Sequence, residues 1–176
     1  MNLYLRLVRV VLAALLRRRP LAVEEVSVLQ FRTGLLDLDP NRHMNNGRFL
    51  TLMDLGRVDL MVRMGLAGEA VRRRWMPVIA SAMVRWRRSL LPFQAFELHT
   101  RLIGWDEKWF FIEQRFVRDD RTVAVGLVKG LFRRPGGHVP TAEVLQASLG
   151  EQPVCEQLPQ SVHEWMAAER HLSGFD

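Results

Sequence analysis

The order of its secondary-structure signals constrains the fold of this chain more than any other feature. Residues 24–33, EEVSVLQFRT, are rich in β-formers and predict a strand. A helix is predicted next, at about residues 46–64, because apolar residues recur there at helical spacing. Residues 75–134 then hold several runs dense in Val, Ile, Phe and Trp, which predict further strands. The helical stripe consists of Phe49, Met53, Gly56, Leu60 and Met64.

Short links separate the later strands, so we expect antiparallel neighbours, since a parallel return needs a crossover of about a dozen residues or more. In FELHTRL, residues 96–102, apolar and polar side chains alternate, which predicts one inward and one outward face. Gly56 on the helical stripe would let the helix backbone approach a neighbouring element closely. One long central helix against a five- to six-stranded antiparallel sheet is an α+β layer fold.

Composition fits one soluble globular domain, because 48% of the 176 residues are hydrophobic and 25% are charged. The single cysteine, Cys155, excludes an internal disulfide and a zinc cluster, and a cytoplasmic location is expected. The net charge of +6 would suit nucleic-acid binding, but five arginines and no acid lie within residues 1–20. Subtracting those five charges from +6 leaves +1 for the remainder, so no nucleic acid is expected as a partner.

The first 20 residues, MNLYLRLVRVVLAALLRRRP, form a basic amphipathic helix in our interpretation. Asn2, Arg6, Arg9, Ala13 and Arg17 fall on one narrow stripe, and the rest is mostly Leu, Val and Ala. The longest apolar run is too short to span a bilayer, which takes about 20 residues. Two placements remain open: peripheral contact with the inner membrane, arginines toward anionic headgroups, or docking on the protein's own body or on a dimer partner.

Three parts of the chain are therefore expected: the amphipathic helix over residues 1–20, the α+β domain over residues 21–140 and a helical tail over residues 141–176. The tail predicts a short helix near residues 142–149 and a polar final helix near residues 161–171.

The segment DLDPNRHMNN, residues 37–46, concentrates acids, amides and a histidine just before the helix. Asp37, Asp39 and Asn41 match the first ligands of a calcium loop. Arg42 and Arg48 stand where that loop needs glycine and glutamate, and a zinc site needs more than one His or Cys. No metal is therefore expected. A polar turn capping the helix explains the amides but explains the histidine poorly.

The motif D-L-D-P-N-R-H-M-N-N-G-R-F-L, followed by M-D-L-G-R, resembles the loop-and-helix signature of hotdog-fold acyl thioesterases. It is similar both to the 4-hydroxybenzoyl-CoA thioesterase type and to plant acyl-ACP thioesterases. The resemblance covers about residues 24–140 and implies a hotdog fold, in which the sheet wraps around one central helix. It also implies a homodimer or a dimer of dimers, with an acyl tunnel beside the central helix at the dimer interface.

The resemblance implies roles for individual residues. Asp39 matches the carboxylate that acts as nucleophile or as base on water, and Asn41 and His43 match the amide and imidazole that orient and activate water. This chain carries both sets, so the choice of mechanism stays open, but we expect Asp39 as the base, with His43 and Asn41 as partners of the water or the carbonyl. Backbone N–H groups near Asn46 and Gly47 would stabilise the oxyanion, because the first turn of a helix has free donors at the positive end of its dipole.

Two arginine clusters, Arg72–Arg74 and the residues around Trp86, could be solvated surface or could bind phosphate. Strand alternation places Arg85 and Arg87 on one face. Guanidinium groups bind phosphate bidentately, so both are candidates for contact with coenzyme A or an acyl carrier protein. The solvated-surface interpretation remains open for both clusters.

We therefore expect an acyl-CoA or acyl-ACP thioesterase of lipid metabolism that hydrolyses an acyl thioester to free acid and thiol, without a cofactor. The alternative is a non-catalytic acyl- or lipid-binding hotdog protein at the membrane surface.

Overall fold

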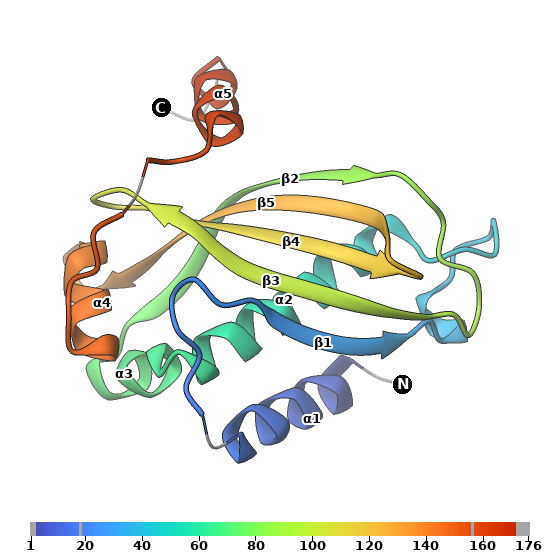
Figure 1. Ribbon diagram of the computed structural model, residues 1–176, viewed down its shortest axis with the longest axis horizontal. Helices are drawn as coiled ribbons and strands as arrows, with labels where there is room; N and C mark the ends of the chain where they lie inside the picture. Colours follow the sequence, from blue (N-terminus) through green and yellow to red (C-terminus); the bar gives the residue numbers. More distant parts are fainter. Residues whose placement is uncertain (1–2, 18, 156, 172–176) are drawn as a thin grey trace.

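The computed structural model describes residues 3–17, 19–155 and 157–171, so Asn2 of the predicted polar stripe and residues 172–176 of the tail lie outside it. One antiparallel sheet curls around a long helix in the described chain (Figure 1). The strands are β1 (Ser27–Arg32), β2 (Met76–Trp86), β3 (Ala95–Trp105), β4 (Phe110–Arg118), β5 (Arg121–Arg134) and β6 (Gly137–Val139). The helices are α1 (Leu3–Leu16), the short 3-10 helix η1 (Leu35–Asp37), α2 (Asn46–Arg63), α3 (Leu66–Arg73), α4 (Thr141–Leu149) and α5 (Gln160–Glu169).

The strands follow the order β1-β3-β4-β5-β2, with β6 pairing β5, and every pairing is antiparallel. The expected α+β hotdog fold is confirmed. The expectation that all strands joined by short links are neighbours is wrong for β2 and β3, because β2 pairs β5 instead. The link at residues 87–94 crosses the end of the curled sheet and is held there by the N–H groups of Arg87 and Arg88, which donate to the carbonyl oxygen of Val123.

Helix α2 is the central helix, and its predicted stripe forms the core. Asn45 caps it, because the Asn45 side chain accepts a hydrogen bond from the Gly47 N–H at 2.8 Å. Phe49 and Met53 pack against the sheet side chains Phe116 and Val128 in one buried cluster. These contacts place the N-terminus of α2 at one end of the sheet, beside the polar loop.

Gly56 brings the helix backbone against the sheet, as predicted. A Cβ atom at this position would clash with Thr100 Oγ1 and would lie 2.8 Å from Gln114 Nε2 and 2.9 Å from Leu98 Cδ2. The buried Gln114 side chain also links the two layers, because its Nε2 donates to Met53 O at 2.9 Å and its Oε1 accepts from Arg57 Nη1 at 2.7 Å.

Two later segments complete the fold. Helices α3 and α4 lie together at the end of the sheet opposite the polar loop (Figure 1). Val162 and Trp165 of α5 pack with Phe111 and Leu127 of the sheet, so the final helix has a buried apolar side.

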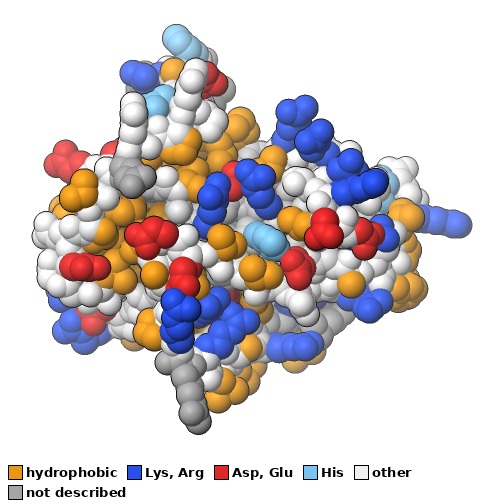
Figure 2. Space-filling model, in the orientation of Figure 1, with side chains coloured by type: hydrophobic (Ala, Val, Ile, Leu, Met, Phe, Trp, Pro, Cys, Tyr) orange, Lys and Arg blue, Asp and Glu red, His pale blue; other side chains and the backbone are white. Residues whose placement is uncertain are grey.

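Helix α1 packs on α2 through the side that carries Arg6. Arg6, Val10 and Ala14 are buried, and Arg6 forms an ion pair with the buried carboxylate of Asp37. Of the two placements left open by the sequence, the structure shows α1 docked on the protein's own body, with Arg6 buried rather than directed toward headgroups. The outward side consists of exposed apolar residues, which follow the lower edge of the molecule in Figure 2. These are Tyr4, Leu5, Val8, Leu12, Leu15 and Leu16.

Candidate active site

Main-chain hydrogen bonds fix the polar loop at the start of α2. The Asn45 N–H donates to Asp37 O at 2.9 Å, and the Asp39 N–H donates to His43 O at 2.9 Å. The Met44 N–H donates to Leu90 O at 2.8 Å, which ties the loop to the link between β2 and β3. Its backbone turns back at Arg42, which has a φ of 60°. The loop is therefore a closed, ordered turn whose side chains have defined directions.

Within this turn, Asp39 and His43 form a pair. Asp39 Oδ2 lies 3.3 Å from His43 Nδ1, and Oδ1 accepts from the Asn41 N–H at 2.9 Å. His43 Nδ1 also lies 3.4 Å from Met44 O. Because both neighbours of Nδ1 are acceptors, the proton belongs on Nδ1, and Nε2 is left as an acceptor. The Asp39 side chain is 13% exposed and that of His43 is 32% exposed, so the imidazole is the more accessible group.

The N-terminus of α2 lies directly after this pair. Gly47 was a predicted oxyanion donor, but its N–H already donates to the cap residue Asn45. The Asn46 N–H has no hydrogen-bond partner among the described residues, and Asn46 is exposed. The donor available to a ligand at this helix end is therefore the Asn46 N–H.

A groove of about 260 Å³ opens beside this helix end. His43 and Asn46 line it from the loop and the helix, and Trp86 and Arg87 line it from the end of β2. The Trp86 ring packs edge-on against Phe49 of α2, with 6.4 Å between ring centroids. The predicted residues His43, Asn46 and Arg87 thus meet at one groove, whereas Asp39 lies behind His43 and the Asn41 side chain is exposed on the loop.

A second groove of about 390 Å³ adjoins the first, because Arg88 and Ser89 line both. Arg118 and Arg121, from the turn between β4 and β5, line its far side. Sequence analysis could not detect this pair, because only the curl of the sheet brings that turn beside the link after β2. Arg85 is exposed on β2 and lines neither groove, so the structure separates it from Arg87.

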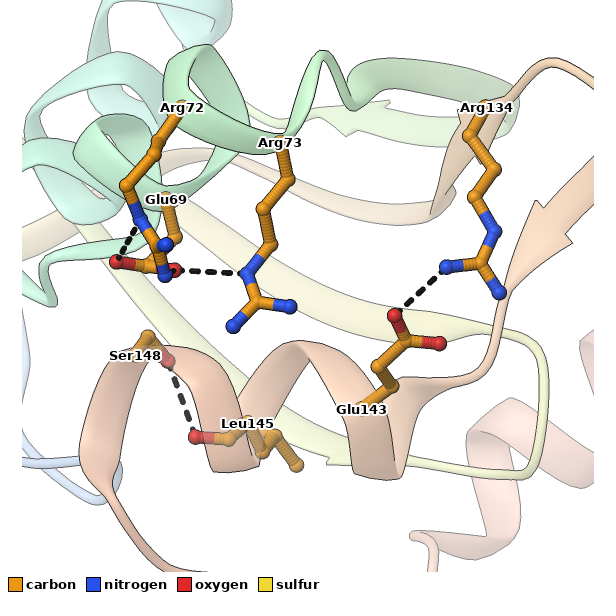
Figure 3. A network of polar contacts seen from close by, with 7 residues as sticks. All are labelled: Glu69, Arg72, Arg73, Arg134, Glu143, Leu145 and Ser148. Atoms are coloured by element: carbon orange, nitrogen blue, oxygen red, sulfur yellow. Dashed lines mark hydrogen bonds and ion pairs between the residues drawn. The ribbon is translucent and has the colours of Figure 1, made fainter.

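In the other predicted arginine cluster, Arg72–Arg74, two arginines bond a residue of the same helix. Glu69 accepts hydrogen bonds from Arg72 and Arg73 on α3 (Figure 3). The hydrogen bonds from Arg72 and Arg73 lower the pKa of Glu69. Arg73 also lies over the Trp75 ring, 5.1 Å from its centroid. These contacts within the protein favour the solvated-surface interpretation of this cluster over phosphate binding.

Asp37 is the buried carboxylate of the loop, a role that the sequence did not distinguish. Its side chain is 1% exposed and lies 2.5 Å from Arg6 Nη2 and 3.2 Å from Arg48 Nε. Its Oδ2 also accepts the Gly34 N–H at 2.8 Å. Asp37 thus joins α1, the loop and the first turn of α2.

Comparison with known proteins places this fold and loop in a family. The family model for the thioesterase-like superfamily matches residues 33–150, about two thirds of the chain. The chain belongs to the thioesterase-like superfamily. Residues 37–46 and all of α2 lie inside the matched range.

Curated proteins resemble this chain over part of their length. Protein THEM6 of Xenopus laevis is 35% identical over 132 residues, which cover 74% of this chain and 62% of that protein. Protein THEM6 of Drosophila melanogaster is 31% identical, covering 74% and 66%. Protein THEM6 of Danio rerio is 42% identical over 90 residues, covering 51% and 45%. The chain therefore spans between about half and two thirds of these curated relatives.

Solved structures share the hotdog fold with this superfamily member. BH1999 gentisyl-coenzyme A thioesterase matches with a TM-score of 0.60 and 20% identity, covering 70% of this chain and 99% of that chain. The probable thioesterase YbaW from Escherichia coli matches with a TM-score of 0.62 and 17% identity, covering 71% and 97%. The CoA complex of SAV2348 from Staphylococcus aureus matches with a TM-score of 0.65 and 11% identity, covering 81% and 94%.

Proposed function

We propose that this protein hydrolyses an acyl-CoA thioester to a free acid and coenzyme A. The observation that carries the proposal is the Asp39–His43 pair, which lies beside the free N–H of Asn46 at the mouth of a groove. Thioester hydrolysis needs an activated oxygen nucleophile and a donor for the developing oxyanion, and this helix end supplies candidates for both. Membership of the thioesterase-like superfamily supports the same reaction.

In the proposed reaction, His43 is the base and Asp39 orients it. His43 Nε2 takes a proton from water as the water oxygen attacks the thioester carbon, while Asp39 accepts the Nδ1–H and stabilises the imidazolium. The carbonyl oxygen becomes an oxyanion facing the Asn46 N–H. When the C–S bond breaks, the imidazolium gives its proton to the thiolate, and the carboxylic acid leaves and loses its remaining proton to solvent water. Asn41 helps to hold Asp39 through its N–H.

The competing mechanism has Asp39 itself as nucleophile or direct base, as the 4-hydroxybenzoyl-CoA thioesterase resemblance implies. The two mechanisms differ in what happens to oxygen. If an acyl-aspartyl anhydride forms and water attacks it at the Asp39 carbonyl carbon, one turnover in water labelled with oxygen-18 leaves label in the Asp39 carboxylate and gives an unlabelled acid. If His43 activates water that attacks the thioester directly, the label goes to the acid. Mass spectrometry of the Asp39 peptide and of the released acid is therefore the measurement, and we expect label in the acid only; trapping of an acyl-enzyme by hydroxylamine would reveal an anhydride that is attacked at its acyl carbon instead.

The function is tested by a thiol-release screen over acyl-CoA chain lengths. We expect turnover with at least one chain length, and a loss of about 10²–10⁴ in kcat for Asp39→Asn and for His43→Gln. His138→Gln is the control, because His138 is exposed on β6 and far from the groove in sequence and fold. Binding of acyl-CoA without any thiol release would establish the alternative, a non-catalytic acyl-binding protein.

The nucleotide end of coenzyme A is proposed to lie along the two adjoining grooves. Arg87 lines the groove that holds His43, and Arg121 lines the next one. Their guanidinium groups could therefore contact the phosphates of a coenzyme A molecule that extends from the thioester along these grooves. Arg87→Ala should raise KM for acyl-CoA about tenfold and leave KM for the matching acyl-pantetheine unchanged, because the latter has no nucleotide. Arg85→Ala is the matched control, since Arg85 is exposed on the same strand but lines neither groove.

We also propose that two copies pair through β2. This strand is an edge of the sheet, and four of its large apolar side chains are exposed. An edge strand presents unpaired N–H and C=O groups that a second strand can bond. Because Trp86 ends this strand and lines the groove, a partner copy at β2 would help to enclose the acyl chain. The exposed side chains are Met76, Ile79, Met83 and Trp86.

A further inference from the structure

The leucines of helix α1 face outward, an orientation that is unfavourable in water because it leaves apolar side chains exposed. The side chains of Leu5, Leu12 and Leu16 are 62%, 55% and 81% exposed. Tyr4, Val8 and Leu15 share this side of the helix, and at helical spacing all six fall within one continuous sector. A contiguous exposed apolar patch of this kind marks an interaction surface.

The inward side of α1 explains how the protein keeps this orientation. Arg6 lies 2.5 Å from the carboxylate of Asp37, and Arg17 lies 3.7 Å from that of Asp59. Asp37 and Asp59 are 1% and 0% exposed, so two buried carboxylates hold the helix near its two ends. Turning α1 about its axis would bury the leucines but would leave both carboxylates without these partners.

The charges around the apolar side indicate which partner covers it. Arg9 is exposed at the border of the apolar side, and Arg19, which follows the helix, is 80% exposed with Glu25 as a partner at 2.8 Å. Residues 3–16 contain no acid. An apolar sector bordered by arginines is the pattern of a helix lying in a membrane interface that contains anionic lipids. A second copy on this side would instead bring arginines against arginines.

Two further exposed leucines lie in η1, next in sequence to the residue that Arg6 contacts. Leu35 and Leu36 are 65% and 71% exposed and directly precede Asp37, the residue that Arg6 contacts. In the described ranges, every helix is too short or too polar to cross a bilayer. A helix of 14 residues is about 21 Å long, which suits a helix lying along the membrane plane.

We propose that the outward face of α1, made of Tyr4, Leu5, Val8, Leu12, Leu15 and Leu16, is a membrane-docking surface that binds anionic lipid bilayers. The protein docks peripherally, with the leucines among the acyl chains and Arg9 and Arg19 at the phosphate level, while Arg17 stays with Asp59. Docking in this way keeps the Arg6–Asp37 pair intact, because that pair lies on the opposite side of the helix. The proposal does not depend on thioesterase activity.

Vesicle flotation with the full-length protein tests the proposal. We expect the wild type to float with phosphatidylcholine vesicles that contain phosphatidylglycerol, and to bind pure phosphatidylcholine vesicles about tenfold less. Leu12→Gln/Leu16→Gln should reduce flotation about tenfold or more, because Gln keeps helix propensity but removes apolar surface. Val71→Gln/Val154→Gln is the matched control, since these residues are 82% and 90% exposed outside α1, and it should float as the wild type does.

Three outcomes would overturn the proposal: a wild type that stays with the unbound fraction, a leucine variant that floats as well as the wild type, or a control variant that loses flotation equally. A fourth would reassign the face to a copy–copy contact: the leucine variant dissociates in light scattering while neither protein binds vesicles. If circular dichroism shows that the leucine variant is poorly folded, a labelling experiment takes its place. A polarity-sensitive dye is attached to Val8→Cys in a Cys155→Ser background, and we expect its emission to shift to the blue with anionic vesicles only.

Discussion

The guanidinium Nη2 of Arg6 lies 2.5 Å from Oδ2 of Asp37, and both side chains are buried, 5% and 1% exposed. This ion pair connects the N-terminal helix with the loop that carries Asp39 and His43. The carbonyl oxygen of Asp37 also accepts the Asn45 N–H at the start of α2, so a change at Arg6 is transmitted to the helix cap. Helix α1 is therefore part of the frame of the candidate active site.

Replacing Arg6 by Ala should destabilise the protein by about 3–5 kcal/mol, because a buried carboxylate loses a charged partner. The loss should fall toward the lower end of that range, since Arg48 Nε remains 3.2 Å from Asp37 Oδ1. Urea unfolding followed by circular dichroism measures the change. Arg9→Ala is the control, because Arg9 is exposed on the same helix, and it should shift stability by less than about 0.5 kcal/mol. Equal effects of the two changes would show that the pair contributes nothing specific.

Gly56→Ala should destabilise the protein by about 1–3 kcal/mol through overpacking. The new methyl group would meet Thr100, Gln114 and Leu98 at distances that require the sheet to move away from α2. Gly68→Ala is the matched control in a helix, since a Cβ there has nothing within 4 Å. The control should stabilise α3 by about 1 kcal/mol, because Ala has the higher helix propensity. Thermal unfolding of both variants measures the difference, and a neutral Gly56→Ala would contradict the close approach.

Met83→Arg should convert a dimer into a monomer, because it places a charge in the middle of the exposed side of β2. Met83 is 45% exposed, so the monomer itself should keep its stability within about 0.5 kcal/mol. Light scattering on the eluting protein measures the mass. Val71→Arg, at a residue that is 82% exposed on α3, should leave the mass unchanged. A wild type that is already monomeric, or a Met83→Arg protein with the wild-type mass, would remove β2 as the contact between copies.

Glu113 should make stability depend on pH in a defined direction. Burial raises its pKa, but the hydrogen bond with Arg115 and the charge of Arg101 lower it, and the net pKa lies below the ordinary value. A carboxyl group whose pKa is lower in the folded state contributes stability above its unfolded pKa of about 4.3 and loses that contribution as pH falls through the folded pKa. The stability difference between wild type and Glu113→Gln should therefore be about 1 kcal/mol at pH 7 and shrink as the pH falls below the unfolded pKa and through the folded one. Urea titrations at pH 7 and at a series of acidic pH values check this, and a constant difference would contradict it.

The sequence predicted the elements that local periodicity determines. The stripe on α2, the alternation on β3 and the cap at Asn45 each lie within a segment of fewer than about 20 residues, so each could be predicted without the fold. The same holds for the polar loop, because Asp39 and His43 lie within one tight turn. The family assignment follows from that loop and the helix after it.

Features that depend on distant partners could not be predicted in the same way. Pairing of β2 with β5 results from the curl of the whole sheet, so the short link to β3 was misleading. The inward direction of Arg6 depends on Asp37, which lies 31 residues further along the chain. The periodicity of α1 distinguished two faces of the helix but did not say which one met a carboxylate. The arginine-lined second groove has the same origin, because Arg88 and Arg121 belong to different connections.

The side-chain amide of Gln114 affects how precisely the candidate active site is oriented. A smooth apolar interface would tolerate small rotations of the central helix about its axis, since leucine and phenylalanine contacts are non-directional. Gln114 donates to the carbonyl oxygen of Met53 and to Thr100 Oγ1, which are directional contacts from the middle of the sheet. This one glutamine thus determines the rotation of α2 about its own axis. That rotation in turn determines the direction of the Asn46 N–H, which lies seven residues, or about 10 Å along the helix axis, from Met53.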